Sequence, residues 1–409
     1  MEYCLHKPNH DLVGEVTLPS SKSISNRLLI IQALSPAKFH IDNLSDSDDT
    51  RELIRALEPE QTIIDVGHAG TTMRFLTAYL SLVEGERLLT GSERMQNRPI
   101  GKLVDSLKQL GADIIYSDKE GYPPLQISGK KLDGGLARID SSVSSQFVSA
   151  LLMVAPVFKN GLQLELEKRT VSSAYIHLTL NLMKEMGIGY TWEGNTISIP
   201  HQAYKPKDLK VEADWSAASY WYEMAALADK VDLKIYGLSE NSLQGDAVVS
   251  GLFGEFGVRT TMIDGGILLS KGERTIREFN YHFIDQPDLV QTFCVLCSLL
   301  SMPFRFTGTE SLKIKETDRI DALQRELAKF NVQIEASIKG DEITFDGNSV
   351  MENIPGIRID TYQDHRMAMA FAPAAFILDE LHINDPDVIT KSYPGFWDDL
   401  TRVGFKIKQ

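Results

Sequence analysis

Three segments in the first half of the chain carry apolar residues at the spacing of one helical face. They are Ile24, Leu28 and Ile31; Met73, Leu76 and Leu80; and Phe147, Leu151 and Leu152. Side chains three and four positions apart lie on the same side of a helix, so each segment predicts an amphipathic helix with a buried stripe. Each predicted helix begins in a run rich in serine or glycine.

One further pattern recurs along the chain: a predicted helix ends at an apolar residue, followed by glycine or asparagine and a short strand-like run. The pattern ends at Gly111, Gly187, Gly257, Asn331 and Gly404, which lie 76, 70, 74 and 73 residues apart. Glycine and asparagine tolerate the left-handed backbone that closes many helices. One such ending is common in α/β proteins, but the regular spacing favours a repeat of about 70 residues.

A sixth repeat is expected before the first of these endings. Residues 52–57 predict a helix there, but Glu58-Pro59-Glu60 replaces the glycine and the strand-like run. The first repeat is therefore predicted to be shortened and to lack most of a strand pair. Six repeats favour an α/β fold of two domains, residues 19–213 and residues 1–18 with 214–409, with chain crossings near Pro19 and near Asp214.

The charge of the chain limits its partners. It has 42 Lys and Arg against 56 Asp and Glu, a formal charge of −14, which argues against binding nucleic acid or an anionic membrane. Any anionic ligand must then be bound by a local group of cations. Since there is no run of 18 apolar residues and no signal-peptide pattern at Met1 to Asp11, we expect a cytoplasmic protein.

The cysteines predict neither a disulfide framework nor a metal site, and the sequence contains no nucleotide-binding motif. Three cysteines are too few for a disulfide framework. Cys294 and Cys297 form a C-x-x-C in an apolar stretch without a second pair at zinc spacing, so we expect buried structural thiols and no metal site. The sequence contains neither G-x-x-x-x-G-K-[ST] nor a G-x-G-x-x-G after a strand, and no cofactor is predicted.

The serine- and glycine-rich helix starts suit small anions. Residues 19–27 read P-S-S-K-S-I-S-N-R, residues 67–74 read G-H-A-G-T-T-M-R, and residues 141–147 read S-S-V-S-S-Q-F. Unpaired backbone N–H groups and the helix dipole favour an anion at such a start, and Lys22 and Arg27 add charge. Each start alone could be only a helix cap. Three of them together favour a shared anionic ligand.

More cations lie in other polar segments. Residues 91–99 read G-S-E-R-M-Q-N-R-P, with Pro99 expected in the first turn of the next helix. The second half offers residues 313–319, Asp364-His365-Arg366 and Lys391. A charge run alone is usually a solvated helix face.

Taken in order, these segments resemble the 5-enolpyruvylshikimate-3-phosphate synthase family over almost the whole chain. The matching motifs are P-S-S-K-S-x-S-N-R, G-x-A-G-T-x-M-R, R-P-I-G-x-L-V-D, S-S-V-S-S-Q-F, K-E-T-D-R and D-H-R-M-A-M. The resemblance implies two domains, each of three repeated βαβαββ units in an inside-out α/β barrel, that close over a ligand. It also implies a transferase of the shikimate pathway in aromatic amino acid biosynthesis, with small-molecule substrates, no membrane partner and a monomeric state.

The resemblance assigns the substrates to residues of both domains. For shikimate 3-phosphate the implied residues are Lys22, Ser23, Arg27, Ser144, Ser145, Gln146, Ser172, Tyr175, Asp288, Ser311 and Lys315. For phosphoenolpyruvate they are Lys22, Gly70, Arg98, Gln146, Arg319, Arg366 and Lys391. Two phosphates and two carboxylates in one site require several permanent cations, and arginine can bind each of them through two hydrogen bonds.

The implied chemistry is addition followed by elimination. Asp288 would take the proton of the 5-hydroxyl, while Glu316 and Lys22 are candidates for protonating the methylene carbon and later removing that proton. Which of the two performs which transfer stays open. His365 is another candidate acid or base, or it holds Asp364 or Arg366 in place.

Two alternatives remain at this point. One is the sister transferase that acts on UDP-N-acetylglucosamine, which uses a cysteine in the loop that corresponds to residues 91–99, where this sequence has none. The other is a non-catalytic anion-binding protein on the same scaffold, although Asp288, Glu316 and Lys22 are all present. Phosphate release with defined substrates would separate these cases.

Overall fold

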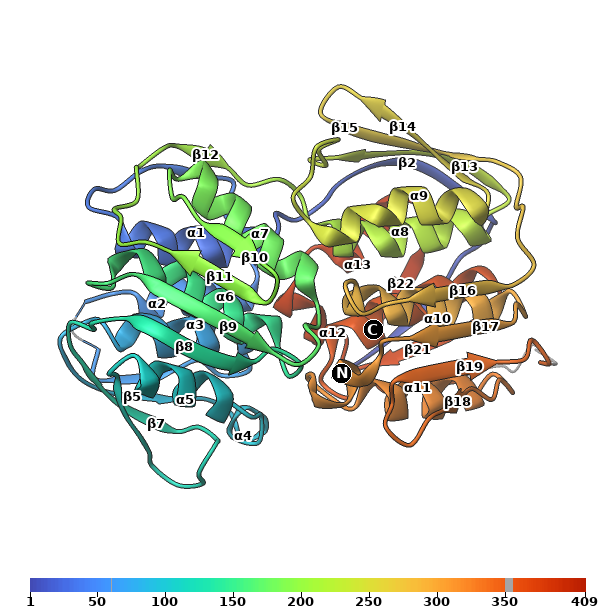
Figure 1. Cartoon of the computed structure of the whole chain (residues 1–409). Helices are drawn as coiled ribbons and strands as arrows, with labels where there is room; N and C mark the ends of the chain where they lie inside the picture. Colours follow the sequence, from blue (N-terminus) through green and yellow to red (C-terminus); the bar gives the residue numbers. More distant parts are fainter. Residues whose placement is uncertain (60, 350–355) are drawn as a thin grey trace. The chain divides into compact units, whose positions relative to one another are not determined.

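The computed structural model describes residues 1–59, 61–349 and 356–409. They form two compact units, drawn in Figure 1: an inserted unit, Ser21–Val211, and a terminal unit, Met1–Ser20 with Glu212–Gln409. The crossings expected near Pro19 and Asp214 lie next to these boundaries. Within the terminal unit, the Asp214 backbone N–H donates to the Pro19 carbonyl at 2.9 Å, so the two crossing segments run side by side.

The inserted unit contains three sheets. Its helices are α1 (Lys22–Leu34), α2 (Asp48–Ala56), α3 (Gly70–Leu80), α4 (Glu93–Gln96), α5 (Gly101–Gln109), α6 (Ser145–Val154) and α7 (Ser173–Glu185), with the 3₁₀ helix η1 (Ala155–Val157). Its strands are β3 (Ile41–Asp42), β4 (Ile63–Asp65), β5 (Gly85–Thr90), β6 (Asp113–Tyr116), β7 (Leu125–Gly129), β8 (Gly135–Asp140), β9 (Leu162–Glu167), β10 (Thr191–Glu193), β11 (Thr196–Ile199) and β12 (Leu209–Lys210). The strand orders are β4-β5-β7-β6, β10-β11-β9-β8 and β12-β3.

The described residues of the terminal unit also form three sheets. Its helices are α8 (Trp215–Leu227), α9 (Val249–Glu255), α10 (Val290–Leu299), α11 (Arg319–Ala328), α12 (His365–Phe371) and α13 (Phe396–Arg402), with the 3₁₀ helices η2 (Gly245–Val248), η3 (Pro287–Leu289), η4 (Glu310–Ile314), η5 (Ala372–Phe376) and η6 (Pro386–Lys391). Its strands are β1 (Glu2–His6), β2 (Asp11–Thr17), β13 (Lys230–Tyr236), β14 (Val258–Ile263), β15 (Gly266–Lys271), β16 (Phe279–His282), β17 (Phe304–Thr307), β18 (Glu335–Ala336), β19 (Glu342–Phe345), β20 (Ile357–Ile359), β21 (Leu381–Asn384) and β22 (Lys406–Lys408). The orders are β14-β15-β13-β2, β16-β17-β19-β18 and β20-β21-β1-β22.

Each of the four-stranded sheets repeats one topology. A parallel pair, such as β4 with β5 or β16 with β17, is extended by two antiparallel pairings. The sheet of β3 and β12 keeps only the parallel pair. The repeated architecture and the shortened first repeat are therefore confirmed, although Glu60 of the predicted ending lies outside the described residues.

The five predicted helix endings have left-handed backbone. The φ angles are +97° at Gly111, +78° at Gly187, +80° at Gly257, +58° at Asn331 and +93° at Gly404. A side chain with a Cβ resists this conformation, which explains why glycine or asparagine recurs there. The endings follow α5, α7, α9, α11 and α13, as expected.

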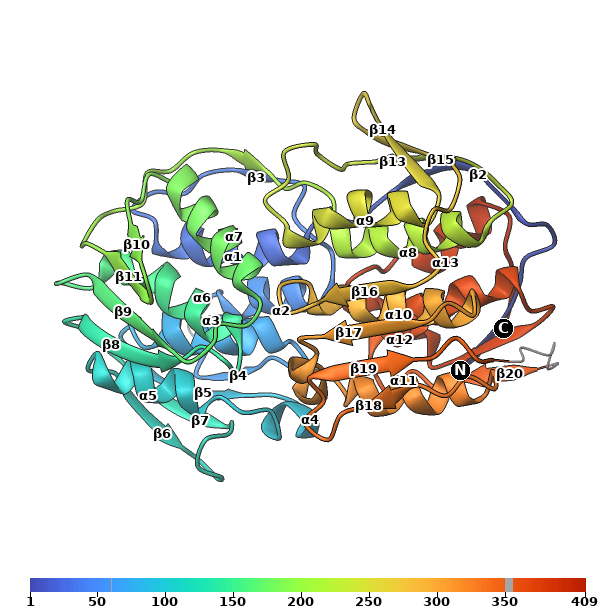
Figure 2. The same ribbon diagram turned by 45° about the vertical axis from the view of Figure 1, so that its right-hand side comes forward.

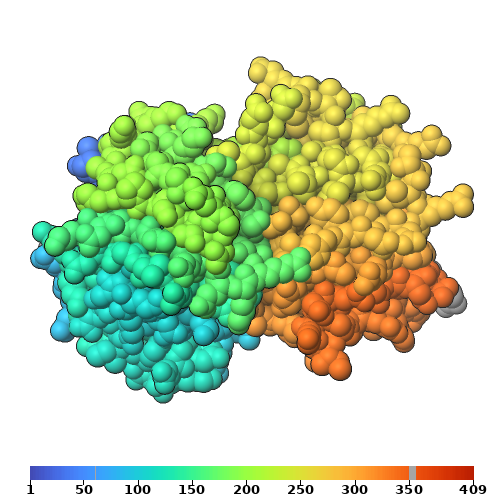
Figure 3. Space-filling view, in the orientation of Figure 1, coloured from blue at the N-terminus to red at the C-terminus, as the bar shows by residue number. Residues whose placement is uncertain are grey.

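In each unit the most deeply buried helices lie inside and the sheets lie on the outside (Figure 2). All residues of α10 and α12 are buried, whereas β13 alternates exposed and buried positions from Lys230 onward. Such a strand packs one face on the helices and turns the other to solvent. On the face drawn in Figure 3, most of the surface of the inserted unit is cyan to green, the part of the chain from β5 to β11 with the helices between them. The expected inside-out arrangement is confirmed, and Cys294 and Cys297 are buried within α10.

Candidate functional site

The serine-rich starts of the inserted unit are helix N-termini. Ser21 caps α1, its hydroxyl accepting the Ile24 backbone N–H at 3.4 Å. Ser144 caps α6 and accepts the Gln146 N–H at 3.2 Å. Gly70 is the first residue of α3. These serines serve as caps, and the remaining N–H groups of each first turn stay available to an anion.

Hydrogen bonds tie these helix starts to one another. Gln146 of α6 donates from Nε2 to the Thr71 hydroxyl of α3 at 3.3 Å. Arg27 of α1 donates to the Tyr175 carbonyl in the first turn of α7 at 3.3 Å. Since α1, α3, α6 and α7 also pack on one another, their N-terminal ends gather in one region of the inserted unit.

Arg27 is the buried cation of this region. Its guanidinium donates to the Thr179 hydroxyl at 2.7 Å, the Ser23 carbonyl at 2.8 Å and the Ser149 hydroxyl at 3.2 Å. Burial lowers its pKa to about 10, while Tyr175 opposes the shift, so the side chain stays charged at neutral pH. Arg27 therefore supplies fixed charge beneath Ser23 and also holds Tyr175 in place.

Arg98 lies against the start of α3. A Cβ built on Gly70 would come within 2.6 Å of Arg98 Nη1, so the absence of a side chain at Gly70 lets the guanidinium approach the helix. Arg74 holds the neighbouring loop, donating to the Gly70 carbonyl at 3.1 Å and the Pro99 carbonyl at 3.2 Å. Arg98 is 7% exposed, a cation beside the backbone of an N-terminus.

The expected position of Pro99 in the first turn of the next helix is wrong. Residues 93–96 form the separate short helix α4, and α5 begins at Gly101 with Ile100 as its N-cap. The N–H groups of Ile100 and Gly101 both donate to the Gly121 carbonyl, at 2.9 and 3.0 Å. This distant acceptor sets the start of α5, and the local sequence gives no sign of it.

Lys22 is paired with a residue that the motifs did not single out. Its Nζ lies 3.3 Å from Asp49 Oδ2, and the two side chains are 14% and 4% exposed. Asp49 lies in the first turn of α2, whose N-terminus stabilises its charge. This contact fixes Lys22 in the first turn of α1, next to Ser23.

In the terminal unit, the predicted catalytic and phosphoenolpyruvate residues form one ion-pair network. Asp288 accepts from Arg319 Nη1 at 3.0 Å and from Arg366 Nη2 at 2.8 Å. Glu316 accepts from Arg319 Nη2 at 3.0 Å and lies 2.9 Å from Lys391 Nζ. The structure thus brings together five predicted residues. Asp288 comes from η3, Arg319 from α11, Arg366 from α12 and Lys391 from η6, and Glu316 lies three residues before Arg319.

Buried partners hold the two arginines in place. Asp364, which is fully buried, accepts from Arg319 Nε at 2.7 Å and caps α12 through the Arg366 N–H at 2.9 Å. Arg366 Nη1 also donates to the Tyr220 hydroxyl of α8 at 3.2 Å. These contacts fix the direction of both guanidiniums.

The charges around Asp288 control its protonation. Burial by itself would raise the pKa of this carboxyl, but the positive charges of Arg366, Lys315 and Arg319 outweigh burial and hold the pKa well below its ordinary value. Nearby, Asp246 is 4% exposed and accepts a hydrogen bond from Ser216. Burial, followed by the charge of Asp288, raises the pKa of Asp246 to about 7.

The remaining predicted residues are close in sequence either to the helix N-termini of the inserted unit or to the ion-pair network of the terminal unit. Ser145 is buried in the first turn of α6, and Ser172, with φ of +54°, is the N-cap residue of α7 but makes no side-chain cap hydrogen bond. Ser311 lies in η4, and Lys315 follows it. His365 is 1% exposed, with Nδ1 3.6 Å from Asp364 Oδ1.

Sequence reasoning missed Asp49, Tyr220 and Asp246 as parts of these groups. Each acts through a side chain far along the chain; Tyr220 and Arg366, for example, are 146 residues apart. The one local signal is Asp49 in the first turn of a predicted helix, a position where carboxylates are common.

The chain is an α/β protein in which helix N-termini of one unit and an ion-pair network of the other carry positive charge suited to small anions. The chain belongs to the EPSP synthase (3-phosphoshikimate 1-carboxyvinyltransferase) family, whose model matches residues 6–59 and 53–400. It is accordingly an enzyme, a transferase of the shikimate pathway in aromatic amino acid biosynthesis.

Curated relatives match the chain over its full length. A 3-phosphoshikimate 1-carboxyvinyltransferase from Bacteroides fragilis is 49% identical over 410 residues, covering 100% of this chain and 99% of the relative. One from Vibrio campbellii is 34% identical, covering 98% of this chain and 99% of the relative.

Solved structures share the fold. EPSP synthase from Acinetobacter baumannii superposes with a TM-score of 0.76 at 20% identity, covering 100% of both chains. The enolpyruvyl transferase NikO from Streptomyces tendae also gives a TM-score of 0.76, at 14% identity, covering 100% of this chain and 98% of NikO. Among the described residues, no helix is both long and apolar enough to cross a membrane.

Proposed function

We propose that this chain transfers the enolpyruvyl group of phosphoenolpyruvate to the 5-hydroxyl of shikimate 3-phosphate, giving 5-enolpyruvylshikimate 3-phosphate and phosphate. The observation that carries the proposal is the 49% identity over the whole chain to a 3-phosphoshikimate 1-carboxyvinyltransferase. The sister reaction on UDP-N-acetylglucosamine is not favoured, because the family model and the curated relatives carry the shikimate activity.

Shikimate 3-phosphate is assigned mainly to the inserted unit. The N-termini of α1, α6 and α7 place serine hydroxyls and backbone N–H groups in one region, with Arg27 beneath them. The assigned residues are Lys22, Ser23, Arg27, Ser144, Ser145, Gln146, Ser172 and Tyr175, with Asp288, Ser311 and Lys315 of the terminal unit. Helix N-termini stabilise a phosphate dianion, and Lys22 and Arg27 add formal positive charge.

Phosphoenolpyruvate is assigned to cations of both units, together with Gly70 and Gln146 of the inserted unit. The cations are Lys22 and Arg98 of the inserted unit, and Arg319, Arg366 and Lys391 of the terminal unit. Arginine binds a carboxylate or a phosphate through two parallel hydrogen bonds. Because Asp364 and Tyr220 fix the two buried arginines, little side-chain entropy is lost on binding.

The reaction proceeds by addition and elimination. The 5-hydroxyl oxygen bonds to C2 of phosphoenolpyruvate, its proton is lost to a base, and C3 gains a proton to become a methyl group. C3 then gives up a proton, the bond from C2 to the phosphate oxygen breaks, and phosphate leaves. The fixed cations stabilise the tetrahedral intermediate and the departing phosphate.

Asp288 is the proposed base for the 5-hydroxyl. It is ionised at neutral pH, but Arg366, Lys315 and Arg319 make it a weak base. When the phosphoenolpyruvate anion binds Arg366 and Arg319, its negative charge offsets theirs, and the basicity of Asp288 rises. The substrate thereby activates the group that removes the proton.

Glu316 and Lys22 are the proposed groups for proton transfer at C3. Glu316 lies between Arg319 and Lys391, and Lys22 beside Asp49. We further propose that the enzyme acts as a monomer in the cytoplasm. The monomeric state rests on the family resemblance, and the cytoplasmic location on the small number of cysteines, which fits a reducing compartment.

Phosphate release with purified protein tests the function. With shikimate 3-phosphate and phosphoenolpyruvate we expect turnover, and Asp288→Asn and Glu316→Gln should each lower kcat by roughly 10²- to 10⁴-fold while circular dichroism stays unchanged. Asp321→Asn is the matched control, because Asp321 is half exposed and pairs with Arg325 on the surface of α11.

The outcomes separate the alternatives. Phosphate release with UDP-N-acetylglucosamine instead would support the sister activity. If no phosphate is released with either acceptor, the chain is a non-catalytic anion-binding protein. Full activity in Asp288→Asn would reject the assigned base.

A further inference from the structure

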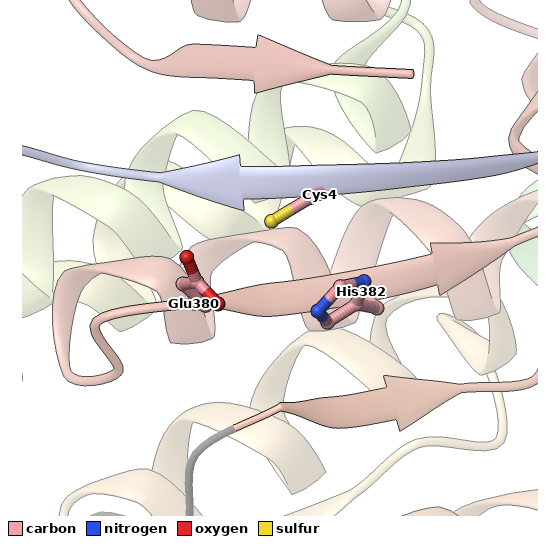
Figure 4. A group of neighbouring side chains, drawn as sticks. All are labelled: Cys4, Glu380 and His382. Atoms are coloured by element: carbon pink, nitrogen blue, oxygen red, sulfur yellow. The ribbon is translucent and has the colours of Figure 1, made fainter.

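The sheet β20-β21-β1-β22 of the terminal unit carries a thiol, an imidazole and a carboxylate on one face. Cys4 of β1 lies directly opposite His382 of β21 in the antiparallel register, so the two side chains share a face. Glu380 lies one residue before β21, and Figure 4 shows its side chain beside those of Cys4 and His382. One ligand atom from each lies within 4.8 Å of the other two (Figure 4).

The orientation of His382 is fixed in the way that suits a metal ligand. Its Nδ1 lies 2.8 Å from Glu2 Oε1. A carboxylate at that distance accepts the Nδ1 proton, which leaves the lone pair on Nε2. Metal-binding histidines in proteins are commonly held by such a carboxylate on the second nitrogen.

Both signs of charge lie on this face. Glu380 and a Cys4 thiolate would supply two negative charges to a dication, while Glu2, behind the imidazole, is already paired with Arg358, which lies opposite His382 on β20. Lys408, opposite Cys4 on β22, stabilises the thiolate, whereas burial and, after it, Glu380 raise the pKa of the thiol. A metal ion that displaces the thiol proton would remove this conflict between Cys4 and Glu380.

We propose that Cys4, Glu380 and His382 form a binding site for a transition-metal dication of the zinc class, which shares no residue with the groups assigned to the transfer reaction. Sulfur, nitrogen and oxygen ligands together select zinc, cobalt or copper over magnesium and calcium. Three protein ligands leave a fourth tetrahedral position for water. This proposal departs from the expectation, drawn from cysteine spacing, that no metal binds.

The geometry needs only a small adjustment. Zinc at about 2.0–2.3 Å from each ligand would bring the ligand atoms to roughly 3.5 Å from one another. Glu380 is exposed, so its side chain can rotate inward, while Cys4 and His382 are held by the strand register. Among the described residues this is the one group of three or more His, Cys, Asp or Glu with ligand atoms so close.

Cobalt and zinc titrations of the tag-free, reduced, full-length chain test the proposal. Co²⁺ should bind with a stoichiometry of one and give a thiolate-to-cobalt charge-transfer band in the near ultraviolet, and Zn²⁺ should displace it. Cys4→Ser should abolish the band, and His382→Ala should weaken Zn²⁺ binding in calorimetry by at least about 10-fold. Glu2→Gln should weaken it by roughly 10- to 100-fold, as expected for a group that orients a ligand.

Two controls make the result specific. His10→Gln removes another histidine of the same unit, 56% exposed and absent from the group, and should leave Zn²⁺ affinity unchanged. Zn²⁺ should also raise the melting temperature of the wild type and not that of Cys4→Ser. The proposal is overturned if wild type and Cys4→Ser bind Zn²⁺ equally, or if the cobalt band persists without Cys4, since it would then come from Cys294 or Cys297.

Discussion

At Gly70 the absence of a side chain decides where a guanidinium lies. Arg98 Nη1 occupies the space that a Cβ would take, at 2.6 Å. The motif containing Gly70 could be recognised in the sequence, and its position at a helix start was predicted. The guanidinium that makes glycine necessary there comes from 28 positions further along and gave no local signal.

Gly70→Ala should therefore weaken phosphoenolpyruvate binding. The added methyl group displaces Arg98, and losing one charge-assisted hydrogen bond of about 1.5–3 kcal/mol would raise KM for phosphoenolpyruvate by roughly 10- to 100-fold. KM for shikimate 3-phosphate should change little. Steady-state kinetics with each substrate varied in turn measures both values.

Gly251→Ala is the matched control, because Gly251 is a helical glycine of α9 with no atom within 4 Å of the added Cβ. It should leave both KM values unchanged. An unchanged KM for phosphoenolpyruvate in Gly70→Ala would show that Arg98 does not bind that substrate.

Long-range partners mark the limit of prediction for single residues. Asp288, Glu316, Arg319, Arg366 and Lys391 were assigned through the family resemblance, and the structure joins them in one ion-pair network. The side chains that orient them, Asp364 and Tyr220, could not be assigned these roles. A hydrogen bond between residues 45 or 146 positions apart depends on the packing of helices, which no local pattern encodes.

The helices of the two units differ in how their N-termini are capped. In the inserted unit the caps of α1, α6 and α7 are serines, so the positive ends of the dipoles remain available to a ligand. In the terminal unit the caps of α8, α11 and α12 are aspartates, whose carboxylates already offset the dipoles. There the positive charge for a substrate comes from side chains instead.

A buried carboxyl in α8 should make stability depend on pH. Glu223 is fully buried, and burial raises its pKa well above the ordinary value, so the folded protein keeps a proton that the unfolded chain loses above its own pKa. The free energy of unfolding then falls as pH rises from the pKa of Glu223 in the unfolded chain towards its higher pKa in the folded protein. The fall is at most about 1.4 kcal/mol per pH unit. Glu223→Gln cannot ionise and removes this dependence.

The melting temperature of Glu223→Gln minus that of the wild type should therefore increase as pH rises above the ordinary glutamate pKa of about 4.3. Differential scanning calorimetry at several pH values measures the difference. The exposed Glu255→Gln, at the end of α9, should give a difference that hardly varies with pH. A constant difference for Glu223→Gln would mean that Glu223 is ionised in the folded protein.

Over the whole molecule, the regular spacing of helix endings was enough to predict the repeats. The backbone is left-handed at Gly111, Gly187, Gly257, Asn331 and Gly404. Glycine and asparagine adopt this conformation most readily, so the helix endings can be recognised in the sequence. Strand order is different, because the sheet of β20, β21, β1 and β22 joins residues from both ends of the chain. The group of Cys4, Glu380 and His382 was missed for that reason.

The inserted unit should fold without the rest of the chain. Residues 21–211 are one continuous segment with its own helices, sheets and core, and a compact segment of this kind usually folds independently. Most residues assigned to shikimate 3-phosphate lie in it, so this ligand should raise the melting temperature of the isolated segment. Circular dichroism with and without shikimate 3-phosphate measures this.

Ser23→Ala should reduce the shift, because Ser23 lies in the first turn of α1, whereas Ser35→Ala, at the opposite end of the same helix, should not. The affinity should be weaker than that of the full chain, which adds Asp288, Ser311 and Lys315. A segment that melts without cooperativity would show that the inserted unit depends on the terminal unit for its fold. A cooperative segment whose melting temperature does not change with shikimate 3-phosphate would instead show that the main binding residues lie in the terminal unit. In that unit the positive charge comes from side chains, because aspartate caps offset the helix dipoles.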